Sequence, residues 1–112
     1  MKNERYIGRS FECDFEPEKE CEVEVAIVTD ETLDMTFASE DERFHLKAIS
    51  SDGCTYLGTW SYARAYVSEP TILGEARLAL YRAKDKSAVL CGTFRSYDDG
   101  SDGRWVVELR PN

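Results

Sequence analysis

Hydrophobic and polar side chains alternate along most of this chain. In the segment CEVEVAIVT (21–29), every second residue is apolar: Cys21, Val23, Val25 and Ile27. Glutamates occupy positions between them and fall on the opposite face. A period of two predicts a β-strand with one buried face and one solvated face. The segments LDMTFAS and RFHLKA repeat the pattern with these apolar residues: Leu33, Met35, Phe37, Phe44, Leu46 and Ala48.

Short clusters of Asp, Ser, Gly and Lys separate the alternating segments. Examples are SSDG, KDKS and YDDGSDG. Such clusters are typical of tight turns between antiparallel strands. They leave eight expected strands, at about 5–15, 20–29, 33–39, 43–50, 54–67, 72–83, 87–97 and 103–110.

Residues 74–86 (GEARLALYRAKDK) are the one segment that also resembles a helix, because Ala, Leu and Arg are good helix formers. Strand is favoured, since Ala76, Leu78 and Leu80 alternate and no N-cap residue precedes them. We therefore predict an all-β fold with little helix: a single antiparallel β-barrel of about eight strands in meander order, with residues 1–112 as one domain. Closure into a barrel removes exposed sheet edges.

The net charge of −8 is unevenly distributed. Residues 1–42 carry 14 acidic and 4 basic side chains, whereas residues 43–112 carry 8 acidic and 10 basic ones. A protein that binds long nucleic acids normally presents a basic stripe to the phosphates, and this chain has none. The second part of the chain can still bind one small anion.

No segment has the length or apolar character of a signal peptide or a membrane span, so we expect a soluble, cytoplasmic protein or a soluble domain of a longer one. Cys13, Cys21, Cys54 and Cys91 lack the C-x-x-C spacing of metal sites, and His45 is the single histidine. We expect no metal or cofactor, and buried free thiols. Cys13 and Cys21 flank a turn and could form a disulfide in an oxidising environment.

Motifs that would indicate an enzyme are missing. The chain contains no phosphate-binding glycine loop, no nucleophile elbow and no paired-histidine motif. His45 lies out of phase with Phe44 and Leu46, so we expect it to face solvent. The segment DDGSDG (98–103) lacks the ligands of a calcium loop and is expected to be a hairpin turn.

One strand carries an unusual number of large aromatic side chains. In regular alternation, five large residues of the segment 54–67 share one face: Tyr56, Trp60, Tyr62, Arg64 and Tyr66. Two interpretations remain open. The rings can fill the barrel core, with Arg64 at its mouth. Alternatively, they line a pocket where rings stack on a planar ligand and Arg64 binds its phosphate or carboxylate.

The neighbouring strands constrain both interpretations. Arg77 and Arg95 alternate with core residues and are expected to face outward, whereas Trp105 is expected in the core. The step Gly-Thr-aromatic occurs both in LGTWSYARAYV (57–67) and in CGTFRSY (91–97).

These motifs carry a resemblance. The tyrosine-rich strand, GEARLALY, LCGTFRSY and the glycine-rich turn after it resemble small calycin-type barrels, the architecture of lipocalins and avidins. Over residues 54–110, the order of the last three strands is similar to the β-barrel domain that senses cyclic dinucleotides in CBASS antiphage effectors. The resemblance implies a nucleotide messenger in the barrel mouth, contacted by these residues: Tyr56, Trp60, Tyr62, Arg64 and Tyr66.

Two functions are compatible with these observations. The first is a small barrel that binds an anionic or aromatic small molecule, such as a cyclic nucleotide. The alternative is a protein-interaction module with a filled barrel, whose acidic strand near residues 20–29 docks on a basic partner, as in an inhibitor, adaptor or immunity-type protein. A cavity lined by Trp60 and Tyr62 favours the first, and a filled barrel favours the second.

Overall fold

The structure is a computed structural model that describes residues 3–12, 20–39, 42–63 and 71–112. All of its regular elements are β-strands. In chain order they are β1 (Glu4–Glu12), β2 (Glu20–Val28), β3 (Thr32–Ser39), β4 (Glu42–Ile49), β5 (Thr55–Tyr62), β6 (Ile72–Arg82), β7 (Ala88–Ser96) and β8 (Asp102–Pro111). Within the described part of the chain, no helix is long and apolar enough to cross a membrane.

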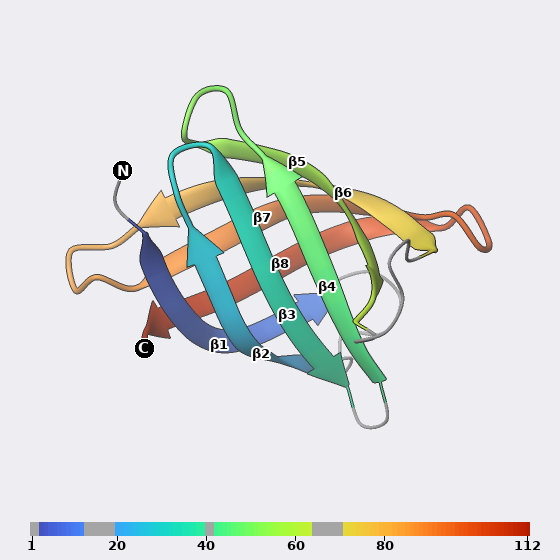
Figure 1. Cartoon of the computed structure of the whole chain (residues 1–112), viewed down its shortest axis with the longest axis horizontal. Helices are drawn as coiled ribbons and strands as arrows, with labels where there is room; N and C mark the ends of the chain where they lie inside the picture. Colours follow the sequence, from blue (N-terminus) through green and yellow to red (C-terminus); the bar gives the residue numbers. More distant parts are fainter. Residues whose placement is uncertain (1–2, 13–19, 40–41, 64–70) are drawn as a thin grey trace.

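Each strand pairs antiparallel with the next, and β8 pairs with β1, so the sheet closes into a barrel. The closing pair runs in register from Tyr6 opposite Pro111 to Glu12 opposite Trp105. In Figure 1, β2, β3 and β4 lie in front and cross β6, β7 and β8 behind them at a steep angle. The predicted fold, an eight-stranded antiparallel meander barrel, is confirmed.

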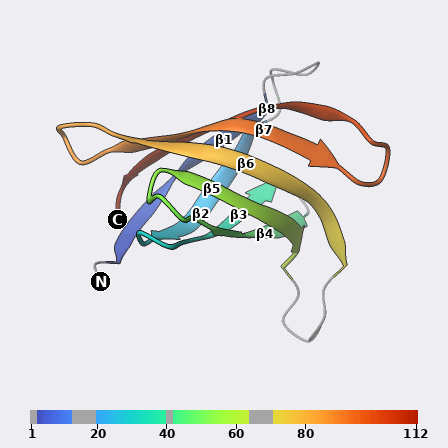
Figure 2. The same ribbon diagram turned by 90° about the horizontal axis from the view of Figure 1, so that it is seen from above.

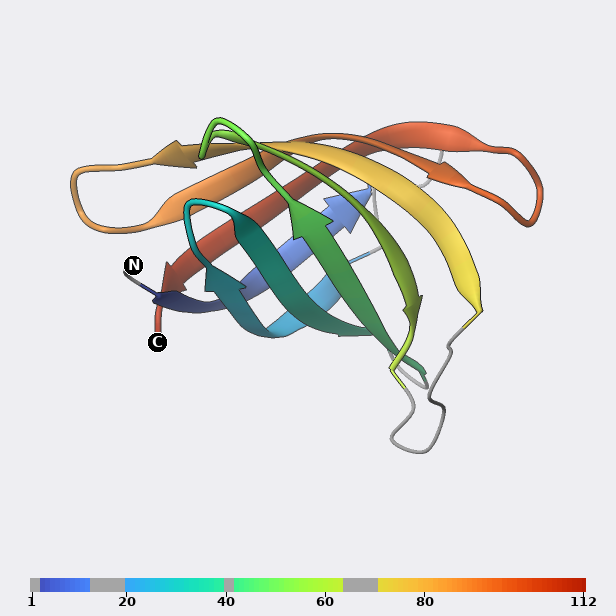
Figure 3. The ribbon, with the colours of Figure 1, turned by 45° about the horizontal axis from the view of Figure 1, so that its top comes forward.

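Residues 72–82 form β6, as predicted from their alternation, although their composition also suits a helix. Ala76, Leu78 and Leu80 all point into the barrel and are buried. Figures 2 and 3 show that β6, β7 and β8 extend beyond the shorter strands, so that the β6–β7 and β7–β8 hairpins project at opposite ends.

The predicted inner face of β2 is wrong beyond its first half. The structure buries Val23 and then Ala26 and Val28, whereas Val25 and Ile27 are only partly buried. The cause is a shift in the register with β3 between Val23 and Val25. A β-bulge of this kind inserts one residue and exchanges the two faces of the strand, and a strict period of two does not anticipate it.

Apolar side chains from all eight strands meet inside the barrel. Among the residues that the structure describes, eighteen of them are buried: Tyr6, Val23, Ala26, Val28, Leu33, Met35, Phe37, Leu46, Ala48, Tyr56, Ala76, Leu78, Leu80, Ala88, Leu90, Trp105, Val107 and Leu109. The largest of those that are fully buried is Tyr56. Burial of this apolar surface is the main favourable term in folding, so it is this inner layer that holds the strands together.

The two Gly-Thr-aromatic steps have the same structural role. A Cβ atom on Gly58 would overlap the backbone of β4 at Lys47 and Ala48, and one on Gly92 would overlap the carbonyl of Arg77 in β6. Glycine is thus required where neighbouring strands approach most closely. In both steps the threonine that follows faces outward and the aromatic ring faces inward.

We predict that Gly92→Ala destabilises the protein by about 3 kcal/mol, at the upper end for overpacking, because backbone rather than a flexible side chain must move. The free energy of unfolding in urea measures the loss. The matched control is Thr93→Ala on the same strand, whose exposed side chain should contribute within about 0.5 kcal/mol. Equal stability of Gly92→Ala and Thr93→Ala would contradict the close strand contact.

Candidate functional site

The described aromatic residues of β5 point into the barrel, on the face predicted from the sequence. Tyr56 is completely buried, and its hydroxyl donates a hydrogen bond of 2.6 Å to the carbonyl oxygen of Thr29. Thr29 organises the β2–β3 turn, because its Oγ1 accepts hydrogen bonds from the backbone N–H groups of Glu31 and Thr32. Tyr56 thus ties the core to this turn.

Six aromatic rings cluster where β3, β5 and β7 end and β4 and β8 begin: Phe37, Phe44, Trp60, Tyr62, Phe94 and Trp105. Trp60 meets Phe94 and Trp105 edge to face, with ring centroids 6.0 and 5.9 Å apart. Such contacts stabilise a core beyond the area they bury.

Trp60 lies opposite Gly74 of β6, where any side chain would overlap its indole ring. Tyr62 stacks on Phe44 at 5.4 Å. Trp60, Phe44 and Phe94 remain only partly buried, whereas Trp105 is buried, as predicted. The two other candidate residues, Arg64 and Tyr66, lie outside the described residues, so ligand binding by this face stays a prediction.

A charged network spans the opposite end of the barrel, near the chain termini. The guanidinium of Arg82 in β6 donates hydrogen bonds to Glu4 of β1, the shortest of them 2.6 Å. The hydroxyl of Tyr6 donates to the same carboxylate at 2.5 Å. Burial, followed by the hydrogen bond to Glu4, raises the pKa of Tyr6 to about 12. The contacts connect strands that do not pair with each other.

This network predicts a loss of stability at alkaline pH. The unfolded chain releases the Tyr6 proton near the ordinary tyrosine pKa of 10.0, whereas the folded protein holds it to about 12. The contribution of Tyr6 to the free energy of unfolding is therefore complete below pH 10, and it falls as the pH rises toward 12. Urea midpoints at about pH 9 and about pH 11.5 should show a smaller decline for Tyr6→Phe than for Tyr81→Phe, the control at an exposed tyrosine. Equal declines would contradict the prediction.

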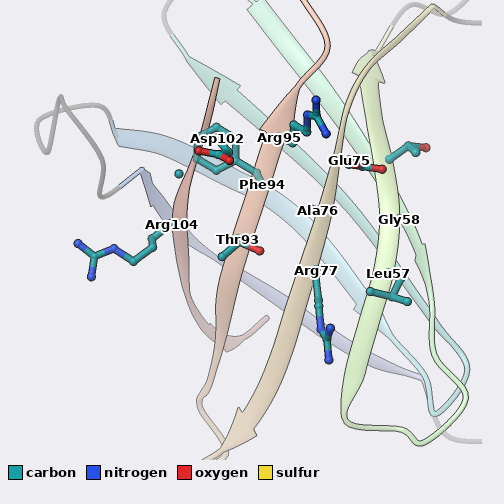
Figure 4. Close-up of a pocket in the computed structure, with 12 residues that line it drawn as sticks. Leu57, Gly58, Glu75, Ala76, Arg77, Thr93, Phe94, Arg95, Asp102 and Arg104 are labelled. Carbon is teal, nitrogen blue, oxygen red and sulfur yellow. The ribbon is translucent and has the colours of Figure 1, made fainter. Parts of the chain in front are cut away.

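An open groove with a volume of about 800 Å³ lies on the outer face of β5, β6, β7 and β8 (Figure 4). Its floor is the backbone around Gly58, Ala76, Phe94 and Gly103. The side chains of Ala76 and Phe94 point the other way, to the inner face of the sheet. Its walls are outward side chains: Leu57, Thr59, Glu75, Arg77, Thr93, Arg95, Asp102 and Arg104. The groove is thus outside the barrel, separated from the aromatic cluster by the sheet.

Antiparallel register arranges the charged walls in two rows across the strands. One, the charged row, places Glu75 opposite Arg95 and Arg95 opposite Asp102, but no ion pair forms between these described residues. The other, the arginine row, places Arg77 opposite Thr93 and Thr93 opposite Arg104. Across β7, the two arginines of this row therefore face a threonine rather than a carboxylate.

Among the described residues, ion pairs join side chains of the acidic half of the barrel, but none joins two side chains that line the groove. On the acidic half, Glu20 pairs with Arg9, Glu24 with Arg43 and Asp34 with His45. In the groove, Arg77, Arg95 and Arg104 form no ion pair with any carboxylate in the described part of the chain. The charge asymmetry of the sequence thus becomes a difference between two faces of the molecule.

Sequence reasoning correctly placed Arg77 and Arg95 on the outer face, and both are exposed. It did not identify the groove. The alternation of β8 also places Arg104 outward, but the concave shape depends on how four strands lie side by side, and no local pattern encodes that.

The expectation of buried thiols is wrong for Cys54 and Cys91, which are exposed. Cys54 lies in the bend before β5, and Cys91 is on the outer face of β7. Cys13 lies outside the described residues, so its pairing with Cys21 is not tested. His45 points outward, as predicted, and contacts Asp34 at 2.5 Å. Among the described residues, no group of His, Cys, Asp and Glu has the arrangement of a metal site.

Comparisons of the chain with protein-family models, with curated proteins and with solved structures found no match. The resemblance to calycin-type barrels and to cyclic-dinucleotide sensors therefore stays a prediction beyond the shared barrel architecture.

Proposed function

We propose that this chain is a protein-interaction module that binds its partner on the outer face of β5–β8. The observation that carries the proposal is the groove of about 800 Å³ in which Arg77 and Arg104 face Thr93, rather than a carboxylate, across β7. Arginine side chains combine charge, planar hydrogen-bond donors and apolar contact area, and they are enriched in protein interfaces.

The packing of the barrel interior also supports an external binding surface. Tyr56 is completely buried and hydrogen-bonded to Thr29, and Trp60 contacts Phe94 and Trp105. Side chains with these contacts contribute to stability in the absence of any ligand. The role proposed for the inner layer is therefore to hold the sheet, and the role proposed for the outer layer is recognition.

The outer face of β5–β8 is a better candidate than the acidic strand β2. The carboxylates of Glu20 and Glu24 already form ion pairs with Arg9 and Arg43. A basic partner would have to compete with these contacts. Arg77 and Arg104 form no ion pair with the residues that the structure describes, so an acidic partner would not have to displace a carboxylate from them.

The proposed role is binding rather than catalysis. The residues that line the groove include carboxylates, arginines and threonines but no histidine or cysteine.

A photo-crosslinking amino acid placed at Thr93 or at Glu22 tests the location of the interface in cells that produce the protein. Thr93 lies in the groove, and Glu22 is an exposed control on the acidic half. We expect one discrete protein adduct from position 93, lost when Arg77→Glu and Arg104→Glu are added. An adduct from position 22 alone, or no adduct from either position, would overturn the proposal.

A second candidate function is a small-molecule site at the aromatic end of the barrel, for an anionic or aromatic ligand such as a cyclic nucleotide. The observation in its favour is that Trp60, Phe44 and Phe94 are only partly buried there. Rings that keep part of their surface accessible are able to stack on a planar base.

Thermal-shift screening with cyclic mononucleotides and dinucleotides tests this second function. If it is correct, at least one nucleotide at about 100 times its Kd stabilises the wild-type protein by about 2.7 kcal/mol. The shift should be lost in Tyr62→Ala and kept in Tyr81→Ala, a control at an exposed outer tyrosine. A shift that Tyr62→Ala retains, or none with any nucleotide, excludes binding at this end.

A further inference from the structure

We infer that the groove recognises a protein segment in which acidic side chains stand next to apolar ones. The acidic side chains contact Arg77 and Arg104, and the apolar side chains contact an adjoining outer surface of β6, β7 and β8. This inference rests on the proposed function and specifies the chemistry of the partner.

The apolar surface adjoins the arginine row directly. Two residues along each strand from the arginine row, Ala79 lies opposite Cys91, and Cys91 lies opposite Val106. One further step brings Tyr81 opposite Val89, whereas the third position of that row, on β8, is the exposed Glu108. We call Ala79, Tyr81, Val89, Cys91 and Val106 the apolar band. Tyr81 is 62% exposed and Val89 36% exposed.

Exposed apolar side chains that form a continuous surface, rather than isolated positions, mark interaction sites. Here the band and the arginine row share the same three strands. Because residues two apart on a strand are separated by roughly 7 Å, the two surfaces fit within one short partner segment. Leu57, 54% exposed, lies opposite Arg77 and continues the apolar contact on β5.

The positions of the two arginines favour an extended partner over a small anion. Arg77 and Arg104 are separated by β7, so their backbones lie about 10 Å apart at the usual strand spacing. In Figure 4 their side chains diverge, with Arg104 extending away from β7 and Arg77 along β6. A single phosphate would require both side chains to change rotamer, whereas two carboxylates on one segment can contact the guanidinium groups where they lie.

The negative net charge of the protein makes two other ligands of the groove unfavourable. The net charge of −8 repels nucleic acid, whose binding requires several neutralised phosphates. A second copy of the chain would carry the same net charge of −8, so long-range repulsion opposes self-association. A short separate segment with two carboxylates is repelled far less than either, because the repulsion scales with the charge of both partners.

The test uses a phage-displayed library of random peptides, selected on the immobilised full-length protein, followed by binding measurements with synthetic copies of the selected peptides. We expect the peptides to be enriched in Asp or Glu together with Leu, Ile or Phe. Each of Arg77→Glu and Arg104→Glu should weaken their Kd at least about tenfold. Tyr81→Ser with Val89→Ser should also weaken binding, whereas Glu22→Lys on the acidic half should not.

The other outcomes separate this inference from the proposed function. Peptides that lose binding in a groove-blocking Thr93→Trp variant, but lack acidic residues and tolerate both arginine substitutions, overturn the inference and leave the interface in place. Failure to select any peptide, or peptides that bind Thr93→Trp as well as wild type, overturns both. Dimerisation that Arg77→Glu abolishes, measured by light scattering, assigns the surface to a second copy and overturns the inference.

Discussion

The close approach of neighbouring strands at Gly58 and Gly92 is the constraint on which the rest of the structure depends. At both positions the backbone of the next strand occupies the space of a side chain. With the sheet held this tightly, the ring that follows two residues later turns inward, and Trp60 and Phe94 meet edge to face. The intervening threonines turn outward and contribute to the groove. One short motif thus builds both the core and the candidate surface.

The two ends of the barrel are closed by different chemistry. Near the termini, Glu4, Tyr6 and Arg82 connect strands that do not pair, and Tyr56 anchors the β2–β3 turn. At the other end the contacts are aromatic. A polar network is directional and no longer stabilises the fold when one partner is missing, whereas packed aromatic rings tolerate small movements. The ligand site proposed as the second candidate function lies at the aromatic end, and the outer groove does not depend on either end.

Acidic side chains are concentrated on one half of the molecule and basic side chains on the other. The acidic half neutralises part of its surface with ion pairs between strands, such as Arg43 with Glu24. Exposed pairs of this kind contribute little to stability. They do reduce the charge available to a partner, which leaves Arg77 and Arg104 as the stronger features for recognition. A protein with a large negative net charge can in this way present a locally basic surface to an acidic segment.

The sequence by itself determined the strands and most of their inner faces, because a side chain that alternates with period two has only two directions available. Leu33, Met35, Leu78, Trp105 and Val107 are buried as their alternation indicates. It also determined that Arg77 and Arg95 face outward. Alternation alone could not reveal the bulge in β2, since the extra residue is defined by the partner strand and leaves no mark of its own.

Only the tertiary structure revealed the groove at which we propose that a partner binds. The sequence directed attention to the aromatic face of β5, because large rings beside an arginine are equally compatible with a core and with a pocket. Packing against Phe94, Trp105 and Thr29 shows that Trp60 and Tyr56 have partners within the barrel. The groove depends on Leu57, Arg77, Thr93 and Arg104, which come from four strands and are far apart in the chain. Their proximity follows from strand register, a property of paired backbones that no single segment carries.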